Sequence, residues 1–208
     1  MNTHPTYSEI IYLLADKFCS QRSKFISYDL HPSGEKITSK PLAIQMILGA
    51  LVYLVKNKYV NLVIKDVKKL FIFPGQDVFM TQNQKLSANV TGIERRIFNN
   101  INVETCVNHT VYNLLSEDDS SPWGQIINIC KKSLLDQKYL IAGEKKIFSA
   151  QTYIFDQAKL EEVSKMQREV SEALKLFERD TKLFQLTEKA VIGGMNSRVE
   201  HDSSVDLD

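Results

Sequence analysis

Lysines gather at two places along this chain, and their type and spacing indicate a binding chemistry. The first group consists of Lys56, Lys58, Lys65, Lys68 and Lys69. The second group follows the only tryptophan, Trp123, and consists of Lys131, Lys132, Lys138, Lys145 and Lys146. Clustered ammonium groups attract anionic lipid surfaces or nucleic acid, but lysines also protect exposed strand edges from unwanted pairing. Trp123 likewise has two interpretations, core packing or an aromatic side chain at a membrane interface.

Residue patterns that carry enzymatic chemistry do not occur in the sequence. The four histidines lie in different segments, and none has a second ligand at metal-binding spacing: His4, His31, His109 and His201. There is no nucleophile elbow, phosphate-binding glycine loop or Cys-x-x-Cys motif. The three cysteines are widely spaced and predict free thiols in a reducing compartment: Cys19, Cys106 and Cys130. We therefore predict a protein that is not an enzyme and uses no metal or cofactor.

Length and composition are those of an ordinary globular domain. The 208 residues fit one domain, and 43% apolar residues are enough to build a core. The net charge of +1 provides no overall field that would attract DNA, which disfavours nucleic acid as a partner. No basic segment followed by an apolar one opens the sequence, so no secretory signal is predicted and a cytoplasmic location is expected.

The fold is expected to form around the apolar stretch Pro41–Val55. Only Gln45 and Gly49 interrupt its apolar residues. A helix of this length spans roughly 22 Å, whereas a membrane-spanning helix needs about 20 apolar residues, so the pattern predicts a helix buried inside a soluble domain. A glycine in mid-helix costs up to about 1 kcal/mol relative to alanine, and the usual compensation is the close approach of another helix.

A helix followed by a hairpin is predicted twice. After the core helix, residues 59–73 are rich in β-branched and aromatic side chains and predict a short hairpin that turns at Lys65-Asp66 and ends at Pro74. After the second apolar helix, Lys138-Tyr139 repeats Lys58-Tyr59 ahead of another hairpin. Each unit resembles a winged helix. The predicted fold class is therefore mainly α, a helical domain around a buried central helix with two short β-hairpins.

The other helices are predicted from amphipathic spacing, at residues 7–19, 86–101, 104–115, 160–177 and 182–191. Thr6 and Glu9 have the spacing of a capping box, and Asp180 is a suitable N-cap for the last helix. Gly193-Gly194 is expected to close that helix. The predicted domain therefore covers residues 1–194, and the acidic residues 195–208 are expected to form a disordered tail.

Five segments, in the same order along the chain, resemble the Golgi phosphoprotein 3 family of peripheral membrane proteins. Thr6–Leu14 is similar to the family's opening T-x-x-E-x-x-x-L-L, and Gly49–Val63 is similar to its core helix, basic turn and strand. Glu104–Trp123 resembles its helix ending in Leu-Leu-Ser and the tryptophan-containing loop that follows. Ser133–Leu140 resembles the helix end before its second hairpin, and Asp180–Leu183 resembles the start of its final helix.

This resemblance implies a mostly helical fold and peripheral binding to anionic membranes through phosphatidylinositol 4-phosphate. In eukaryotes it also implies a Golgi adaptor that retains glycosyltransferases as protein clients. The chain departs from the family where the lipid pocket uses one Trp and several Arg, because the aligned positions hold Ile37, Met46, Gly124 and Ile127. The arginine-rich leading segment of eukaryotic members has no counterpart here, and in length the chain is more like the bacterial members.

We therefore expect a non-enzymatic, adaptor-like peripheral membrane protein with an altered headgroup pocket. Its expected lipid- or anion-binding residues are Trp123, Lys131, Lys132, Lys145 and Lys146. Because arginine fixes a headgroup better than lysine, binding should follow overall anionic charge, be screened by salt and show little preference for phosphatidylinositol 4-phosphate. Two alternatives stay open, a winged-helix nucleic-acid binder that uses residues 138–146 as its wing, and a protein-interaction module. An oligomer is compatible with each.

Overall fold

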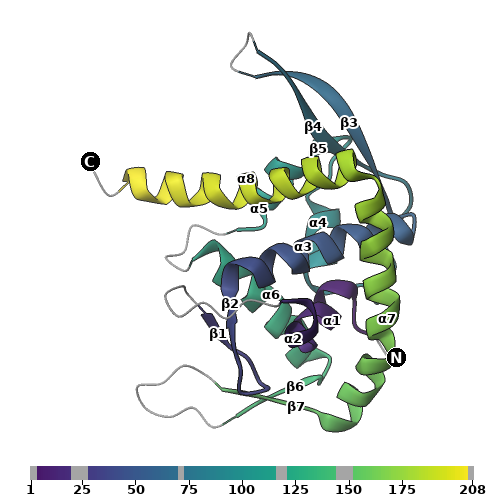
Figure 1. Cartoon of the computed structure of the whole chain (residues 1–208), viewed down its shortest axis with the longest axis vertical. Coiled ribbons are helices and arrows are strands. Elements are labelled where there is room, and N and C mark those ends of the chain that lie inside the picture. The colour runs from purple at the N-terminus through teal and green to yellow at the C-terminus, as the bar shows by residue number, and fades with distance from the viewer. Residues whose placement is uncertain (1–3, 20–27, 70–72, 116–120, 144–151, 206–208) are drawn as a thin grey trace.

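The chain folds into helices packed around one central helix, with small antiparallel sheets at the periphery (Figure 1). The computed structural model describes residues 4–19, 28–69, 73–115, 121–143 and 152–205. The structure is 60% helical and 18% strand, which confirms the predicted mainly α class. The helices are α1 (Tyr7–Leu13), α2 (Ala15–Phe18), α3 (Ser39–Lys56), α4 (Gly92–Asn99), α5 (Val107–Asn113), α6 (Pro122–Asp136), α7 (Gln157–Arg179) and α8 (Thr181–Val205).

The strands form separate small sheets in the described part of the chain, ordered β1-β2, β3-β4-β5 and β6-β7. Their bounds are β1 (Tyr28–Leu30), β2 (Lys36–Thr38), β3 (Val60–Lys69), β4 (Phe73–Gln82), β5 (Thr105–Cys106), β6 (Leu140–Ala142) and β7 (Tyr153–Phe155). All pairings are antiparallel. Because each sheet is small, the helices carry most of the core.

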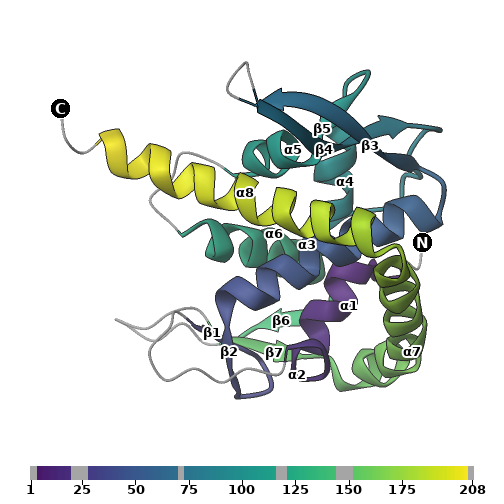
Figure 2. The same ribbon diagram turned by 45° about the horizontal axis from the view of Figure 1, so that its top comes forward.

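Helix α3 is the predicted central helix and runs through the middle of the molecule, with α1, α6, α7 and α8 around it (Figures 1 and 2). Six of its large apolar side chains are at most 1% exposed: Leu42, Met46, Ile47, Leu48, Leu51 and Leu54. Burial of one such side chain contributes roughly 1.5–3 kcal/mol. By length and composition alone α3 could cross a membrane, but 61% of that stretch is buried inside the protein, as in the core helix of a soluble domain.

Gly49 allows α1 to approach α3 closely. A Cβ atom at position 49 would lie 2.3 Å from Cδ1 of Ile11, a side chain that is itself fully buried. The close helix approach predicted from this glycine is therefore confirmed, and it seats α1 directly on the central helix.

Helices α3 and α6 end in the same turn. Lys58 and Lys138 take left-handed backbone conformations, with φ of 59° and 61°. The N–H of Tyr59 donates to the carbonyl of Leu54 at 2.9 Å, and the equivalent bond from Tyr139 to Leu134 is also 2.9 Å. This is the Schellman arrangement, in which a residue past the helix end satisfies a carbonyl of the last turn. The helix–Lys-Tyr–hairpin repeat read from the sequence thus shares one backbone conformation at its helix ends.

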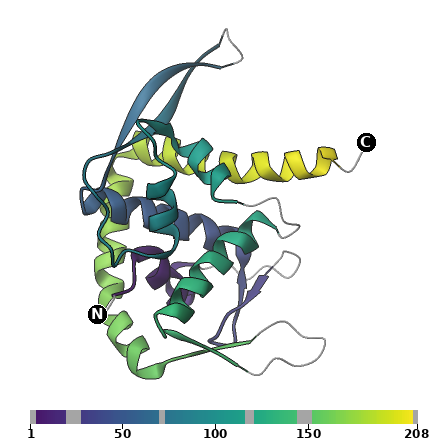
Figure 3. The ribbon, with the colours of Figure 1, turned by 180° about the vertical axis from the view of Figure 1, so that it is seen from behind.

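The first hairpin is longer than predicted. Strands β3 and β4 have 10 residues each and form an arm that projects from the helical body (Figures 1 and 3). Lys65 and Asp66 lie within β3 and form no turn. They are accommodated there because Lys65 pairs with Glu104 at 2.6 Å and Asp66 accepts from the Gln76 amide at 2.9 Å.

Pro74 lies inside β4 and does not end the hairpin as predicted. It faces Lys68 across the ladder, while β5 pairs only with Phe79 and Met80 on the other side of β4. Pro74 therefore stands at an edge of the sheet, where a residue without an N–H is tolerated.

Three predicted helices are shorter than their amphipathic patterns. The first ends at Leu13 and is followed by the separate short helix α2, and the helix predicted at 104–115 covers only Val107–Asn113 because β5 precedes it. The helix predicted at 86–101 begins only at Gly92, because the side chain of Arg95 folds the preceding loop onto itself. Its guanidinium donates to the carbonyls of Val90 at 2.7 Å and of Ala88 at 2.9 Å.

Helix α8 passes through Gly193-Gly194 and continues to Val205, so the disordered tail predicted from residue 195 is wrong as far as Val205; residues 206–208 lie outside the described residues. Met195 is fully buried. The glycine pair does not end the helix because it provides room for α5, as a Cβ atom at position 194 would lie 2.5 Å from the carbonyl oxygen of Asn108. The predicted boundary at 194 therefore falls inside a packed helix.

Replacing Gly194 with alanine should destabilise the protein by about 1–3 kcal/mol, because the new methyl group meets backbone of α5 and overpacking costs this much. Alanine is the better helix former, so helix propensity alone predicts that the substitution stabilises the protein. Gly193 is the matched control, since its Cβ would meet the Asn108 side-chain amide at 2.7 Å, which can rotate away. Urea unfolding followed by circular dichroism measures both. Equal stability of the two variants would contradict this packing.

Candidate functional site

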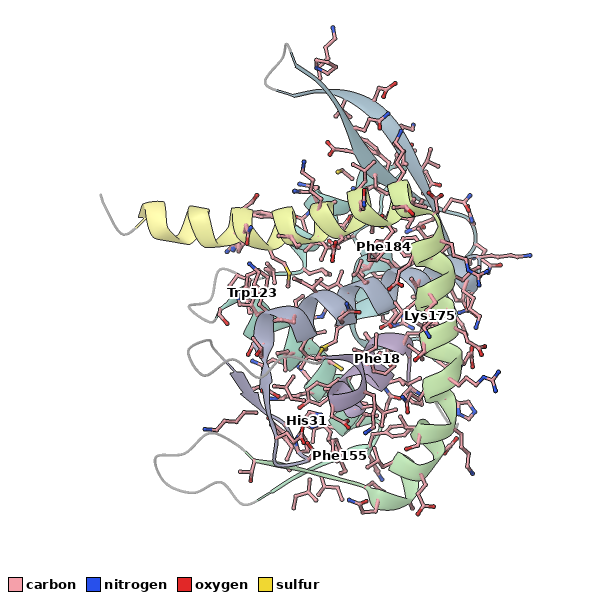
Figure 4. The ribbon with its side chains drawn as sticks, in the orientation of Figure 1. Phe18, His31, Trp123, Phe155, Lys175 and Phe184 are labelled. Carbon is pink, nitrogen blue, oxygen red and sulfur yellow. The ribbon has the colours of Figure 1, made fainter. Side chains whose placement is uncertain are left out.

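Trp123 lies in the first turn of α6. Its helix begins with Pro122 at N1, and the side chain of Ser121 accepts the N–H of Gly124 at 3.2 Å. The indole packs against the core on one side, and Nζ of Lys40 lies 4.8 Å from its ring centroid (Figure 4). Lys40 belongs to the first turn of α3, so the N-terminal ends of α3 and α6 meet at this tryptophan. Trp123 is half-buried, so it packs against the core as one interpretation expected, while its role at a membrane interface stays a prediction.

Lys131 does not lie at the surface, in contrast to its predicted role as an anion-attracting residue. Its ammonium is 2.5 Å from a carboxylate oxygen of Asp29, and the two side chains are only 11% and 14% exposed. The rings of Tyr12 and Tyr153 lie 5.9 and 5.3 Å away. Residue 131 is on the inward face of α6, so Lys131 ties that helix to strand β1 and has no charge to spare for a ligand.

Of the other residues of the predicted site, the structure describes Trp123 and Lys132, and these two lie apart. Lys132 is exposed on α6, and Lys138 is exposed at the turn after it. Lys145 and Lys146 lie outside the described residues. Trp123 and Lys132 are separated by about 14 Å along the helix, at about 1.5 Å per residue. Among the described residues of this unit, the surface cations Lys132 and Lys138 are dispersed, and whether they form a headgroup site with Lys145 and Lys146 stays a prediction.

The positions aligned with the family's pocket residues are mostly core positions here. Ile37, Met46 and Ile127 are buried within the hydrophobic core, while Gly124 lies in the first turn of α6. A headgroup cannot reach side chains that are packed in the core. Their apolar character is therefore explained by packing.

The first lysine group is also partly used within the protein. Nζ of Lys56 lies 2.6 Å from the hydroxyl of Tyr7 and 2.7 Å from a carboxylate oxygen of Glu169, and that hydroxyl donates to Glu169 at 2.8 Å. These contacts join α3, α1 and α7. Lys58 and Lys68 are exposed. In the described part of the arm, lysines are scattered, and Lys65 is paired with Glu104.

A pair of exposed isoleucines on the second hairpin was not found from the sequence. Ile141 of β6 and Ile154 of β7 face each other across the ladder and are 53% and 56% exposed. Their neighbours Leu140 and Phe155 point into the core and are nearly buried. The sequence allowed inward-facing and outward-facing positions to be assigned by their alternation along each strand. An apolar residue on the outer face, however, departs from the usual pattern, in which outward positions are polar.

Two buried glutamates form the most densely hydrogen-bonded site among the described residues. Glu9 accepts the N–H of Thr6 at 2.8 Å, as the predicted capping box requires, and the hydroxyl of Ser133 at 2.6 Å. Glu94, from α4, accepts the N–H of Ser8 at 2.9 Å and its hydroxyl at 2.7 Å. Both carboxyl groups therefore satisfy donors at the start of α1.

Burial and the neighbouring Glu9 raise the pKa of Glu94 to about 7, although its bonds from Ser8 favour the ionised form. Its carboxyl group therefore changes protonation near neutral pH. Both side chains are fully buried. The pair can hold a proton and fasten α1 to α4 and α6.

His31 is held as a neutral structural residue. Its Nε2 lies 2.7 Å from the carbonyl of Tyr12, its Nδ1 accepts the N–H of Ser33 at 3.3 Å, and burial lowers its pKa. Figure 4 shows it beside Phe155. Within the described residues no group of three or more His, Cys, Asp or Glu could hold a metal ion. All three cysteines are free thiols, as predicted.

Among the described residues, the exposed isoleucine pair of the second hairpin is a surface feature that combines apolar side chains with lysines close by in the chain. The resemblance to the Golgi phosphoprotein 3 family stays a prediction. No family model, no curated protein and no solved structure matches the chain.

Proposed function

We propose that this protein is a non-enzymatic peripheral membrane protein that binds anionic bilayers through hairpin β6–β7. The observation that supports this is the exposed cross-strand pair Ile141–Ile154, which leaves two large aliphatic side chains in water at neighbouring positions. Peripheral proteins attach by placing apolar side chains at the headgroup boundary while basic residues attract anionic lipid. Lys132 and Lys138 are exposed in the same helix–turn–hairpin unit and supply that attraction.

Attraction of this kind selects charge and not a particular headgroup. Selective recognition needs donors fixed in a converging geometry, and the exposed lysines of α6 and its turn are dispersed. Each juxtamembrane lysine contributes about 1 kcal/mol near an anionic leaflet, and physiological salt screens this over a Debye length of about 8 Å. The protein should therefore bind phosphatidylserine and phosphatidylinositol 4-phosphate vesicles equally well at equal surface charge.

Liposome co-sedimentation tests the proposal directly. Phosphatidylcholine vesicles are compared with vesicles that carry phosphatidylserine or phosphatidylinositol 4-phosphate at matched charge, each at low and at physiological salt. We expect binding to both anionic vesicles, little to phosphatidylcholine, and steep weakening as salt rises. Tight, salt-resistant and headgroup-selective binding would overturn the charge-driven mechanism. A shifted DNA band in a parallel gel assay would favour the winged-helix alternative.

Two variants separate the apolar contribution from the electrostatic one. Ile141→Ser/Ile154→Ser should lose most of the binding, and Lys132→Glu/Lys138→Glu should weaken it at least about tenfold, since two contributions of about 1 kcal/mol are removed. Val103→Ser is the matched control, because Val103 is an 89% exposed aliphatic residue in a different part of the fold. Equal binding by the isoleucine variant and the control would exclude hairpin β6–β7 as the attachment site.

A further inference from the structure

Strand β3 is the edge of its sheet and has a free outer side along its whole length. In the part of the chain that the structure describes, it hydrogen-bonds only to β4, in the order β3-β4-β5. Its other substantial contact is with α3 at the base of the arm. Because the arm projects from the helical body, no described element covers this edge (Figures 1 and 3).

The alternation of the ladder shows which backbone groups of β3 point outward. The carbonyl of Tyr59 accepts the N–H of Asn83 at 2.9 Å, so the groups of Tyr59 face β4. Backbone groups of an antiparallel strand alternate between its two sides. Those of the even-numbered residues Leu62 and Ile64 therefore point away from β4, where they can pair with another strand.

The base of this edge lacks the devices that protect edge strands. Natural edges are guarded by charged side chains, proline or bulges. Residues 60–64 contain no charged residue and no proline, and their ladder with β4 is continuous. Val63 is 44% exposed on the outer face. The lysines of the strand itself begin only at Lys65, towards the distal half of the arm, and Lys58 stands just before the strand at its base.

We propose that β3 pairs antiparallel with β3 of a second copy of this chain, centred on Val63, so that two three-stranded sheets become one. Two antiparallel edge strands of identical chains are related by a two-fold axis perpendicular to the sheet. This rotation leaves every side chain on the same face of the sheet, so the residue on the axis must lie opposite the same residue of the second copy. Centring on Lys65 or Asp66 would oppose like charges, which destabilises a cross-strand pair.

Centring on Val63 gives uncharged or singly charged pairs from residue 61 to residue 65, whereas Val60 then faces Asp66 and Lys58 faces Lys68, so the favourable pairing is confined to residues 61–65. The two Val63 side chains face each other and lose their exposure, Leu62 faces Ile64 of the second copy, and Asn61 faces Lys65. Leu62 and Ile64 already pack partly against the core, whereas Val63 is the exposed residue of the three. This register therefore buries the side chain that is most exposed to water in the monomer. The backbone bonds of Leu62 and Ile64 extend the existing ladder in the mode of β-strand addition.

A charge-swap at the centre tests the register with the full-length chain. Wild-type protein should change from monomer to dimer with rising concentration in sedimentation equilibrium. Val63→Lys and Val63→Glu should each stay monomeric, because two like charges would then face each other. A one-to-one mixture of the two should dimerise again. Val103→Lys, which adds the same charge at an exposed site elsewhere, should dimerise like wild type.

Rescue by mixing shows that the single variants are folded, since a misfolded chain would not be restored by its counterpart. Amide exchange of the unaltered protein gives a second measurement. The N–H groups of Leu62 and Ile64 should become protected as concentration rises, while that of Val63, which faces β4, should be protected throughout. A wild-type chain that stays monomeric, a Val63→Lys chain that still dimerises, or Leu62 and Ile64 amides that exchange independently of concentration would each overturn the proposal.

Discussion

Lys131→Met should lower the free energy of unfolding by about 3–5 kcal/mol, which is the cost of removing one partner from a buried ion pair. The reason is that Asp29 would keep its charge at a site where only 14% of its side chain meets water. Among the described residues, its other side-chain hydrogen bond is a long one of 3.4 Å from the hydroxyl of Tyr12. Urea unfolding followed by circular dichroism measures the loss.

Two matched variants separate this effect from a general loss of charge. Lys132→Met removes a neighbouring lysine that is exposed, so it should change stability by less than about 0.5 kcal/mol. Lys131→Met/Asp29→Asn should recover most of the loss, because the uncompensated charge is gone and Tyr12 keeps an acceptor. If Lys131→Met is as stable as Lys132→Met, the ion pair does not hold α6 to β1. Membrane experiments should leave Lys131 unchanged, since its loss would mimic a binding defect by unfolding the protein.

The stability that Glu94 contributes should depend strongly on pH. Its pKa is raised from about 4.5 to about 7 in the folded protein, chiefly by burial. The folded state therefore keeps a proton that the unfolded chain has already released, so the contribution is largest below about pH 4.5 and declines as pH rises to about 7. At 1.36 kcal/mol per unit, the total decline is about 3 kcal/mol.

Glu94→Gln isolates this contribution, because glutamine can accept the N–H of Ser8 but does not titrate. As pH rises from about 4.5 to about 7, the free energy of unfolding of wild type should fall relative to that of Glu94→Gln. Taking the difference cancels other titrating groups, including His31, whose lowered pKa gives a slope of opposite sign. A difference that stays constant with pH would show that Glu94 is ionised throughout, as an ordinary exposed carboxylate would be.

The sequence was sufficient for features that depend on local patterns. The burial of α3 follows from its nearly continuous apolar residues, the capping contact between Thr6 and Glu9 follows from their spacing, and Asp180 caps α8 by accepting the N–H of Leu183 at 3.1 Å. The close approach of another helix was also predicted correctly from Gly49, because a glycine in mid-helix has few uses other than close packing.

Features that depend on distant partners could not be read from the sequence. Gly193-Gly194 has the pattern of a helix end, but α5 packs there and the helix continues. Lys65-Asp66 has the pattern of a turn, but Glu104 and Gln76 satisfy these side chains within a strand. Lys131 and Lys132 are adjacent and chemically identical, and only the rotation of α6 decides that one is buried against Asp29 while the other meets solvent. For the candidate site, Trp123 and Lys132 could be located on their helix, but the outward isoleucine pair could not.

The way α1 is anchored has a consequence for synthesis on the ribosome. Its three main fastenings join residues far apart in the chain, with Ser8 bonded to Glu94 across 86 positions, Glu9 to Ser133 across 124 and Tyr7 to Glu169 across 162. An emerging chain therefore carries an apolar segment whose set of partners stays incomplete until α7 has been translated. Such long-range closure is slow and leaves hydrophobic surface open to chaperones or to aggregation in the meantime. The domain should complete its fold late in translation, as one unit, and not element by element as it leaves the exit tunnel.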